Sequence, residues 1–438
     1  MRHDILQPVR GMRDLMPEEA WKLRFIEDNA RRLAELYGYE EVITPIIEHY
    51  ELLAAKIGEE NRKRMYVFED MGGRKVALRP EFTASMARLV ATKLLTAPKP
   101  IRLFSFGRLY RYDEPQLGRY REFWQANYEL VGSSRPEADA EILHLTNDFL
   151  KSLGLRNYTV KVNHVGILRE ILSHEGISED GQNAIMQALD KKNWDKAIDH
   201  AKNLGARDEC IEVLRNLINI RGYDKNKFIN EVDEAVKAYP EAMGALNNFR
   251  ETIDLIDEAG IKMQLYFEAG FARGLEYYTG IIFETYVPEL SIAICGGGRY
   301  DKLIESFGGG MIPAVGVAFG VDRIMLAMDK QSISLPKSRR EKALVISLDS
   351  GLLAEAIKVA GMLRENGIPS EVEVMGRGLT RALSDASRRN ITHAIIIGRK
   401  EIGWGKVILR DMGSKVQEEV KVEELPVKIR GESSSKSG

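Results

Sequence analysis

The stretch RLYRYDEPQLGRYREFWQ, residues 108–125, decides how the first part of the chain is expected to fold. On each side of a central Pro115-x-x-Gly118 break, apolar or aromatic residues alternate with charged ones. Alternation with a period of two on both sides of a turn predicts a β-hairpin with its charged side chains on one face. Four of the charged residues are Arg108, Arg111, Arg119 and Arg121.

Two interpretations of these arginines are open. A guanidinium group matches phosphate oxygens and stays charged at any working pH, so arginines on a rigid hairpin can hold a phosphate-bearing ligand. Phe123 can then stack on a base. The alternative is a solvated strand face on which the arginines pair with Asp113, Glu114 and Glu122. The hairpin alone does not decide between them.

The composition is that of a globular protein with a full core. At 438 residues the chain has room for two to three domains of about 150 residues each. Hydrophobic residues make up 44% and charged residues 29%, which is ordinary for this class. The net charge of −2 means that any surface for nucleic acid must be local.

Cysteine usage and hydropathy exclude several other classes. Cys210 and Cys295 stand far apart, with no C-x-x-C and no Cys/His cluster, so neither a disulfide framework nor a structural zinc is predicted. The N-terminal MRHDILQPVRGMRD is too polar for a signal peptide, and no apolar run approaches about 18 residues. We therefore expect a cytoplasmic protein without a membrane segment.

The first 330 residues predict an α+β domain, an antiparallel sheet with helices around it. Residues 165–260 are almost wholly helical in pattern and look like an insertion. Pro45 lies within the predicted strand 39–48, and because proline lacks a ladder donor this strand should lie at an edge or interface. Further predicted elements are helices at 17–37 and about 136–153, a hairpin at 65–80, strands at 262–268 and 280–287, and helical segments in RYDKLIESF and AVGVAFGVDRIMLAM.

The pattern changes near the C-terminus. Residues 331–342, QSISLPKSRREK, are polar with a proline and are predicted to be a linker. From 343 to 426, strand and helix patterns alternate, which indicates a separate α/β domain with a mostly parallel sheet. Residues 427–438 are predicted to be a disordered tail, since they end in GESSSKSG.

Three further segments carry residues that suit a ligand site. FARGLEYYTG (271–280) places Arg273 before two adjacent tyrosines, although a loop whose tyrosines fill the core would have the same sequence. ICGGGRYDKL (294–303) has three successive glycines, which suit a backbone that a ligand approaches closely. It lacks the G-x-G-x-x-G spacing, and no Walker sequence occurs. GVAFGVDRIMLAM (316–328) puts Arg323 on an apolar helix, where it either snorkels to water or reaches a ligand.

Together these segments resemble class II aminoacyl-tRNA synthetases. The hairpin arms are similar to motif 2 of that class, GVAFGVDRI to motif 3, and GYEEVITPIIE to the dimer-forming motif 1. ARGLEYYTG and CGGGRYDKL resemble the two signatures of the histidyl-tRNA synthetase family, to which LRPEFTAS and PVRGMRDLMPEE are also similar. The segment from 343 resembles the anticodon-binding domain of that family. The resemblance covers nearly the whole chain in the right order.

The resemblance implies a ligase that activates L-histidine with ATP and Mg²⁺, charges tRNA(His), and acts as a homodimer. Arg111 would hold the α-phosphate and Arg323 the γ-phosphate, while Phe123 stacks on adenine. Arg273 would bridge the histidine carboxylate and the α-phosphate, and Arg273 and Arg111 are the implied catalytic pair. Phosphoryl transfer mainly needs in-line positioning and neutralised oxygens, which fixed arginines with Mg²⁺ supply. The implied ATP-binding set is Arg111, Asp113, Phe123 and Arg323.

The resemblance also implies a histidine pocket. Glu81, Thr83 and Gln125 would hold the α-ammonium and carboxylate groups. Glu129 and the Tyr277/Tyr278 pair would hold the imidazole, since a neutral imidazole has one donor and one acceptor that a carboxylate and a hydroxyl can satisfy. Such a pocket rejects apolar rivals, which leave its polar groups unpaired. The full implied set is Glu81, Phe82, Thr83, Gln125, Glu129, Arg273, Tyr277 and Tyr278.

The sequence departs from the commoner family pattern in three places. Glu276 stands where Asp is usual, Phe82 where bacterial members have Gly, and Asp113-Glu114 where many members have Glu-Arg. These departures bear on the adenine contacts and on how the hairpin tip meets the acceptor end of tRNA. They leave the arginines in place.

Two alternatives remain within the resemblance. A catalytically inactive synthetase-like regulatory subunit of histidine biosynthesis lacks the anticodon domain and erodes the arginines, whereas both are present here. Another amino-acid specificity is the second alternative, but the threonyl enzyme holds its substrate on zinc and neither cysteine here has ligands nearby. Residues 337–410 hold 14 Lys and Arg against 8 Asp and Glu, which together with the preceding linker favours tRNA contact over a merely solvated surface.

Overall fold

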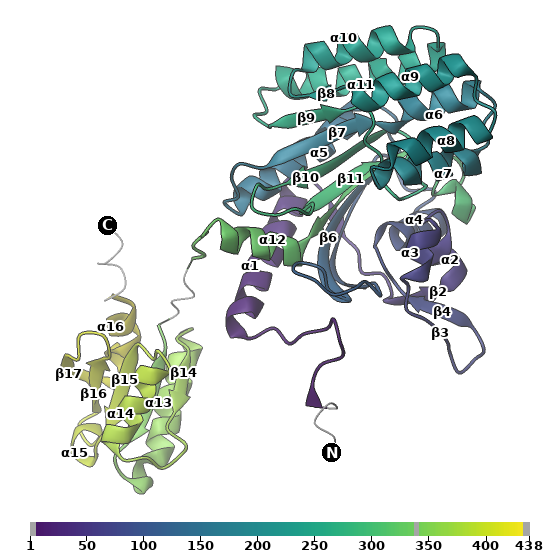
Figure 1. Ribbon diagram of the computed structural model, residues 1–438. Coiled ribbons are helices and arrows are strands. Elements are labelled where there is room, and N and C mark those ends of the chain that lie inside the picture. Colours follow the sequence, from purple (N-terminus) through teal and green to yellow (C-terminus); the bar gives the residue numbers. More distant parts are fainter. Residues whose placement is uncertain (1–5, 337–340, 432–438) are drawn as a thin grey trace. The chain divides into compact units, whose positions relative to one another are not determined.

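The computed structural model describes residues 6–336 and 341–431, and the chain forms two compact units that divide after Ile333 (Figure 1). The first unit is built on a nine-stranded sheet in the order β1-β5-β6-β12-β11-β10-β7-β9-β8. Its strands are β1 (Glu40–Glu41), β5 (Ile101–Tyr110), β6 (Glu122–Val131), β7 (Thr159–His164), β8 (Arg221–Gly222), β9 (Leu265–Glu268), β10 (Ile281–Tyr286), β11 (Cys295–Arg299) and β12 (Ala314–Gly320).

Most neighbouring strands of this sheet are antiparallel, as predicted, but two pairs are parallel. β1 pairs with β5, and β7 pairs with β9, in parallel register. Parallel pairing requires a long crossover connection. Helices lie between β1 and β5, and the whole helical insertion lies between β7 and β9, so both pairs have one. The sheet is therefore mixed.

The hairpin predicted around residues 108–125 is confirmed, with Ile101 opposite Val131 and Tyr110 opposite Glu122. Its turn is longer than the sequence suggests. Residues 111–121 form the connection, so Arg111, Arg119 and Arg121 lie beyond the strand ends and only Arg108 lies on a strand. Gly118 adopts a positive φ of 72°, which favours glycine, and Pro115 has no N–H to extend the ladder.

Alternation along β6 separates a core face from a site face. Tyr128 is fully buried against Phe104, Phe149 and Phe319, and its hydroxyl donates to the Ala30 carbonyl oxygen at 2.7 Å. The helices that pack on this face include α1 (Pro17–Leu36) and α5 (Pro136–Ser152), with α12 (Val321–Lys330) beside α1. The odd-numbered residues of β6 therefore face away from these helices.

Three local predictions are wrong. The predicted strand 39–48 is interrupted: β1 ends at Glu41, β2 (Ile47–His49) joins a separate sheet, and Pro45 falls between them. Residues 314–320 form strand β12 rather than a helix, because they are buried between β6 and β11. In RYDKLIESF only the 3₁₀ turn η2 (Glu305–Phe307) is helical.

The small sheet has the order β2-β4-β3, with β3 (Val67–Glu69) and β4 (Lys75–Leu78) forming the second predicted hairpin. The helices α2 (Tyr50–Ala54), α3 (Glu59–Lys63) and α4 (Thr83–Lys93) belong to the same part of the chain. Thr83 is the first residue of α4, and Glu81 stands just before this helix. Both line the same pocket as residues of β6.

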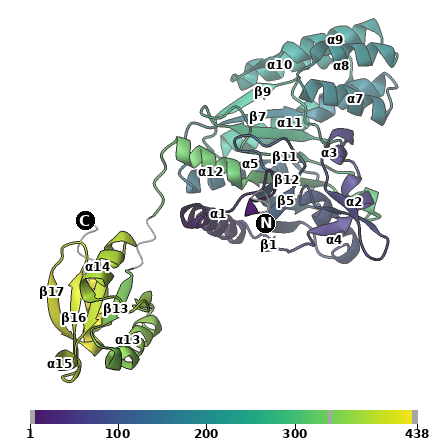
Figure 2. The same cartoon turned by 60° about the horizontal axis from the view of Figure 1, so that its bottom comes forward.

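The predicted helical insertion is confirmed. Its helices gather beyond the β7–β9–β8 end of the sheet in both views (Figure 1, Figure 2). They are α6 (Val165–His174), α7 (Glu179–Asp190), α8 (Trp194–Asn203), α9 (Asp208–Asn219), α10 (Lys225–Val236) and α11 (Pro240–Glu258). α11 packs against α5 and α6, which joins the insertion to the core of the unit.

The second unit has a five-stranded sheet in the order β14-β13-β15-β16-β17. β13 (Ala343–Ser347) is parallel to β14 (Ser370–Val372) and β15 (His393–Ile397), while β16 (Lys406–Asp411) and β17 (Gln417–Lys421) are antiparallel. Its helical segments are η3 (Ser350–Leu352), α13 (Leu353–Glu365), α14 (Leu379–Arg388), α15 (Arg399–Ile402), η4 (Val422–Glu424) and α16 (Leu425–Gly431).

The predicted tail starts too early. Residues 427–431 belong to α16, whose Leu425 and Ile429 are buried in the core of this unit. The rest of that prediction, residues 432–438, lies outside the described residues, as do residues 337–340 of the predicted linker. Over the described ranges, every helix is too short or too polar to cross a membrane.

Candidate active site

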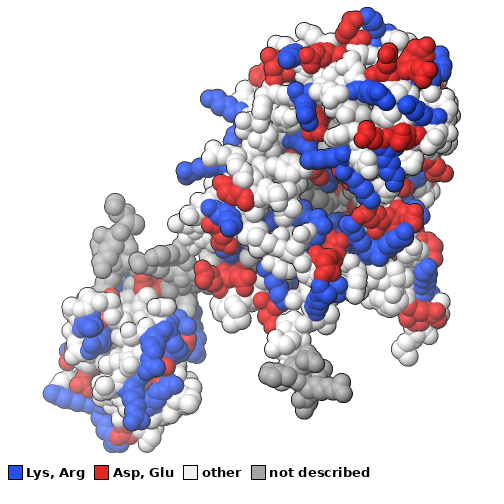
Figure 3. All heavy atoms as spheres, viewed as in Figure 1, with Lys and Arg blue, Asp and Glu red and all other residues white. Residues whose placement is uncertain are grey.

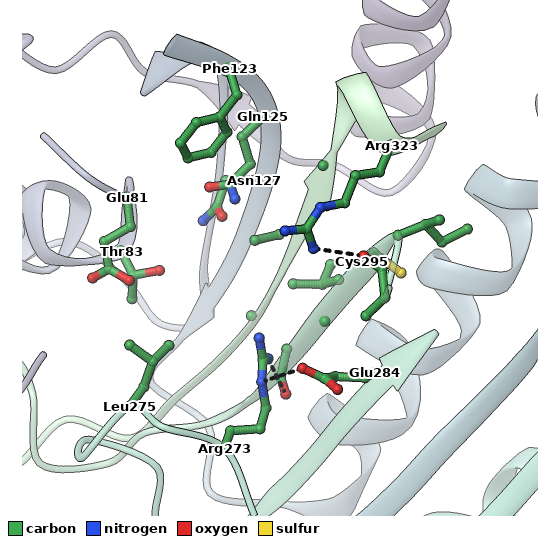
Figure 4. Close-up of a pocket in the computed structure, with 18 of the residues that line it drawn as sticks. Glu81, Thr83, Phe123, Gln125, Asn127, Arg273, Leu275, Glu284, Cys295 and Arg323 are labelled. Atoms are coloured by element: carbon green, nitrogen blue, oxygen red, sulfur yellow. Dashed lines mark hydrogen bonds and ion pairs between the residues drawn. The ribbon is translucent and has the colours of Figure 1, made fainter. Parts of the chain in front are cut away.

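A pocket on the site face of the nine-stranded sheet collects nearly all of the predicted residues (Figure 4). β6 supplies Phe123, Gln125 and Glu129, and the loop before β10 supplies Arg273 and the two tyrosines. The predicted residues that line the pocket are Glu81, Thr83, Arg111, Asp113, Phe123, Gln125, Glu129, Arg273, Tyr277, Tyr278 and Arg323. Segments nearly 250 positions apart in the sequence therefore meet in one cavity.

Phe82 is the exception. Its side chain is 1% exposed, belongs to the core that includes Met86 and Leu103, and lies under the guanidinium group of Arg79 at 4.4 Å. Phe82 is the residue before α4, and Glu81 and Thr83 on either side of it face the pocket. The prediction that Phe82 contacts the substrate is therefore wrong.

One end of the pocket is a group of hydrogen-bonded polar residues around Glu129, which we call the carboxylate cluster: Glu81, Thr83, Asn127, Glu129, Tyr277 and Tyr300. Thr83 Oγ1 and Asn127 Nδ2 donate to Glu129 Oε1 at 2.7 Å and 2.6 Å. The hydroxyl of Tyr300 donates to Glu129 Oε2. Gly316 lies opposite Glu129 on β12, where a Cβ atom would stand 1.7 Å from Glu129 Oε2. Only glycine leaves room for this carboxylate.

Burial is the largest influence on the pKa values of Glu129 and Glu81. Glu129 is 1% exposed, and burial raises its pKa to about 7 even though its three hydrogen bonds act in the opposite direction. Burial likewise raises the pKa of Glu81, while the positive charge of Arg111 lowers it. Raised carboxyl pKa values of this kind concentrate at functional sites.

The hydroxyl groups of the tyrosines have partners other than those expected from the resemblance. The Tyr277 hydroxyl donates to Glu81 Oε2 at 3.0 Å, and Tyr278 accepts a bond from Arg273 Nη1 at 3.0 Å. The hydroxyl on Glu129 is that of Tyr300 rather than of Tyr277 or Tyr278. The three rings lie close together, since Tyr277 is 4.9 Å from Tyr278 and 5.6 Å from Tyr300.

Arg273 is fixed in the middle of the pocket. It donates to Tyr278 and to the Gly297 carbonyl oxygen at 3.3 Å, and Glu284 Oε1 lies 3.4 Å from its Nε. Burial opposes its charge, but Tyr278 and Glu284 keep the pKa of Arg273 above its ordinary value. A Cβ atom at Gly296 would lie 2.8 Å from Arg273 Nη1. Of the three glycines that suggested a close approach by a ligand, Gly296 thus makes room for Arg273.

The other end of the pocket holds Arg111, Arg119 and Arg323, which we call the arginine cluster. Arg111 Nε donates to the Pro80 carbonyl oxygen at 2.9 Å, and Arg323 donates to the carbonyl oxygens of Gly118 and Ala293 at 3.2 Å and 2.8 Å. Figure 4 shows the guanidinium groups of Arg323 and Arg273 pointing toward the same space.

The arginine cluster has too little negative charge. Burial, together with the positive charges of Arg111 and Arg119, lowers the pKa of Arg323 to about 10. Burial also lowers the pKa of Arg111. Asp113 lies 3.9 Å from Arg119 and 3.5 Å from Arg64. Glu81 also favours the charge of Arg111, and Glu284 that of Arg323, but burial outweighs both. Buried cations that repel each other favour an anionic ligand.

The aromatic ring of Phe123 lies beside this cluster, with the Arg111 guanidinium carbon 5.2 Å from its centroid. Gln125 Oε1 and Asn127 Oδ1 are buried in the pocket, and neither has a hydrogen-bond partner among the described residues. A buried acceptor without a partner is costly, so both oxygens suit a donor on a ligand.

Sequence reasoning missed Asn127, Glu284 and Tyr300. Asn127 lies between Gln125 and Glu129 on the same face of β6, so the alternation of the strand could have revealed it. Tyr300 lies in the marked segment ICGGGRYDKL, but nothing local singles out Tyr300 itself or Glu284. Their roles depend on the strand order that brings β10 and β11 next to β12 and β6.

The sheet, its arginine-lined pocket and the separate α/β unit define a class II aminoacyl-tRNA synthetase. The family model of histidyl-tRNA synthetase matches residues 11–324, and that of the anticodon binding domain matches residues 342–432. The chain belongs to the histidyl-tRNA synthetase family.

Individual relatives agree over almost the full length. The chain is 41% identical over 424 residues to the histidine--tRNA ligase of Methanocaldococcus jannaschii, covering 96% of this chain and 99% of the relative. It is 38% identical to that of Sulfolobus acidocaldarius, covering 96% and 97%. Among solved structures, apo histidyl-tRNA synthetase of S. aureus superposes with a TM-score of 0.74 at 25% identity over 97% of this chain and 99% of that one. The inactive regulatory subunit is therefore not favoured.

Proposed function

We propose that the enzyme activates L-histidine with ATP and transfers it to the 3′ end of tRNA(His). The observation that carries this proposal is one cavity in which an arginine cluster short of counter-charge meets a buried, prearranged carboxylate cluster, with Arg273 between them. The first cluster suits a polyphosphate and the second a small molecule with several N–H groups.

In the proposed first step, a histidine carboxylate oxygen attacks the α-phosphorus of ATP. A new P–O bond forms, the bond to the β-phosphate breaks, and pyrophosphate leaves. Arg111 holds the α-phosphate, Arg323 the γ-phosphate, and Arg273 both the carboxylate and the α-phosphate. Fixed cations at these oxygens stabilise the charge of the transition state without reorganising.

Adenine stacks on Phe123, with Asp113 at the same end of the pocket. Mg²⁺ arrives with the nucleotide, since this ion is usually held by substrate phosphates and one or two carboxylates. The carboxylates that line the pocket near the arginines are Asp113 and Glu284, and this donor set fits such an arrangement.

Histidine lies at the carboxylate cluster. Glu81 and Thr83 take its ammonium group together with the unpaired Gln125 Oε1, and Glu129 accepts from the imidazole N–H. Tyr278 supplies a hydroxyl at the other side of the ring. A side chain without N–H groups would leave these buried acceptors unpaired, which is how the pocket selects.

The test is pyrophosphate exchange with each of the twenty amino acids, followed by charging of tRNA. Exchange should require histidine and Mg²⁺-ATP. Exchange driven by another amino acid would contradict the substrate, and binding of histidine without any exchange would favour the regulatory alternative.

The C-terminal unit is proposed to bind the anticodon stem and loop. Lys and Arg gather on the face of this unit that carries α13 and α14 (Figure 3). Such contacts release counterions, so tRNA affinity should fall steeply with salt. A chain ending near residue 335 should keep histidine-dependent exchange and lose most charging of tRNA. Full charging by that chain would assign the unit another role.

We also propose a cytoplasmic homodimer. Ile43, Ile46 and Ile47 follow the edge strand β1 and are 92%, 44% and 49% exposed, and such apolar side chains next to a sheet edge favour a two-fold contact. Sedimentation at micromolar concentration should give twice the chain mass, and a monomer would contradict the proposal.

A further inference from the structure

The loop that carries Arg273, Tyr277 and Tyr278 is tied to the helical insertion by one partly buried arginine. Arg169, on α6, donates from Nε to the Tyr278 carbonyl oxygen at 3.0 Å and from Nη2 to the Glu276 carbonyl oxygen at 3.3 Å. The same guanidinium group donates to Asn183 Oδ1 at 3.0 Å and to Gln182 Oε1 at 3.4 Å, both on α7. It thus joins α6, α7 and the loop.

Arg169 is unusual because all four acceptors are neutral. Within residues 6–336 and 341–431, no carboxylate lies within ion-pair distance of its guanidinium group. Burial lowers the pKa of Arg169, which shows that its charge is costly here. The charges of Glu179 and Glu276 act in the opposite direction to burial but do not cancel it. A partly buried charge without a direct ion pair among the described residues is poor evidence of a purely stabilising role.

Helix α7, the second helix of the insertion, also lies close to the loop at Gly274. A Cβ atom at Gly274 would lie 2.8 Å from Asp190 Oδ2, at the last residue of α7. Glu179, the first residue of α7, forms an ion pair with Lys56 at 2.6 Å, and Lys191 pairs with Glu60 at 2.5 Å. Both ends of helix α7 are therefore anchored to the segment 56–60.

Packing alone does not fix the loop. Tyr277 and Tyr278 line the active-site pocket and also a second cavity of about 480 Å³, which Arg169, Glu179, Glu276 and Lys302 border as well. Both tyrosines pack in the hydrophobic core, but they border open space on this side, so the hydrogen bonds of the loop add to its packing in setting its position. Its backbone is held from the insertion side by Arg169.

We propose that Arg169 is a positioning residue: it sets the place of Tyr277, Tyr278 and Arg273 and so couples the helical insertion to histidine recognition. The inference rests on the proposed function. Loss of the tether should loosen the histidine end of the pocket and leave the arginine cluster intact, because Arg111 and Arg323 are held by other segments.

The test compares R169M and R169K with the wild-type enzyme in histidine-dependent pyrophosphate exchange. R169M should raise the KM for histidine about tenfold or more, the scale for losing hydrogen bonds to a charged group, while the KM for ATP stays within about twofold. R169K keeps the charge but cannot reach all four acceptors, so its KM for histidine should lie between those of the wild type and R169M. R215M is the matched control, since Arg215 is an exposed arginine of the insertion, on α9.

A second variant separates positioning from folding. N183A removes one partner of the guanidinium group and should give a smaller rise in the histidine KM, and R169M/N183A should be no worse than R169M, because both changes act through one contact. Thermal shift by histidine alone gives a readout without turnover. Equal rises in both KM values with a lower melting temperature, or an unchanged histidine KM in folded R169M, would overturn the proposal. Failure of the wild-type enzyme to exchange with histidine would instead contradict the proposed function.

Discussion

The two ends of the pocket solve opposite electrostatic problems. In the carboxylate cluster, Glu129 accepts three hydrogen bonds from protein groups, and Glu81 accepts one from Tyr277. In the arginine cluster, Arg111 and Arg323 donate to backbone carbonyl oxygens and lie near other cations. The two carboxylates of one end are hydrogen-bonded to protein groups before any ligand arrives, although Asn127 Oδ1 beside them has no partner among the described residues. At the other end, Arg111 and Arg323 bond neutral carbonyl oxygens.

This difference indicates which end of the pocket selects the amino acid and which end provides affinity for the nucleotide. Polar groups that are held in place before binding accept only a ligand whose hydrogen-bond donors and acceptors match theirs. Uncompensated buried cations gain most when a polyanion binds, because the ligand removes a cost that the folded enzyme already carries. We therefore expect histidine to be chosen at one end and ATP to stabilise the enzyme at the other.

The largest effect is expected at Arg273, which joins the two ends. R273A should lower the rate of histidine-dependent exchange by about 10²–10³, the scale for losing one preorganised donor at a developing charge. Histidine binding should weaken less than turnover, and R273K should recover part of the rate. Wild-type exchange by R273A would show that the two ends work without this bridge.

Arg323 tests the claim that the arginine cluster is short of counter-charge. R323M should raise the KM for ATP about 10- to 100-fold, since hydrogen bonds to charged groups contribute about 1.5–3 kcal/mol. Without ATP the variant should melt at the same or a higher temperature, because a buried cation with a lowered pKa has been removed. The rise in melting temperature that ATP causes should shrink. R135M, which changes an exposed arginine, serves as the control.

Substitution of Glu129 should instead affect the binding of histidine and not that of ATP. E129Q should raise the KM for histidine about 5- to 150-fold, or about 1–3 kcal/mol, and leave the KM for ATP nearly unchanged. Its effect on stability depends on pH. The folded state binds the Glu129 proton more tightly than the unfolded chain, so this group lowers the free energy of unfolding as the pH rises from 4.5 to about 7.

E129Q should remove that dependence and be more stable than the wild type at pH 8, by about 1–3 kcal/mol from the size of the shift. Denaturant unfolding at pH 5 and pH 8 checks the sign. If both proteins lose the same stability between these pH values, Glu129 does not ionise in this range and the carboxylate cluster is not strained by burial.

The sequence predicted the fold wherever the pattern was local. The two hairpins, the helical insertion and the α/β order of the C-terminal unit follow from alternation, helical periodicity and turn residues. AVGVAFG was mistaken for a helix because a short apolar run has no decisive period, and only its burial between β6 and β11 makes it a strand. The break at Pro45 likewise depends on a second sheet that the sequence does not announce.

The candidate site was predictable where a motif carried it, and less so where packing decides. The motifs marked Arg111, Arg273 and Arg323, which all line the pocket. Phe82 failed because its neighbours face the pocket while its own side chain fills the core. Tyr300 lies in the marked segment ICGGGRYDKL, but its role had no local signal: its bond to Glu129 spans 171 positions and exists only because of the strand order.

Tyr300 therefore gives the smallest and sharpest test of the comparison. Y300F removes one of three hydrogen bonds to Glu129 and should raise the KM for histidine about 2- to 10-fold, since a single bond contributes about 0.5–1.5 kcal/mol net. The bond also lowers the pKa of Glu129, so its loss should move that pKa upward and extend the pH range over which stability falls. Y128F is the control, because Tyr128 loses an equally buried hydroxyl that bonds Ala30 on the core face. A change in the KM for ATP, or equal effects of Y300F and Y128F on the KM for histidine, would show that the carboxylate cluster does not act as a separate unit.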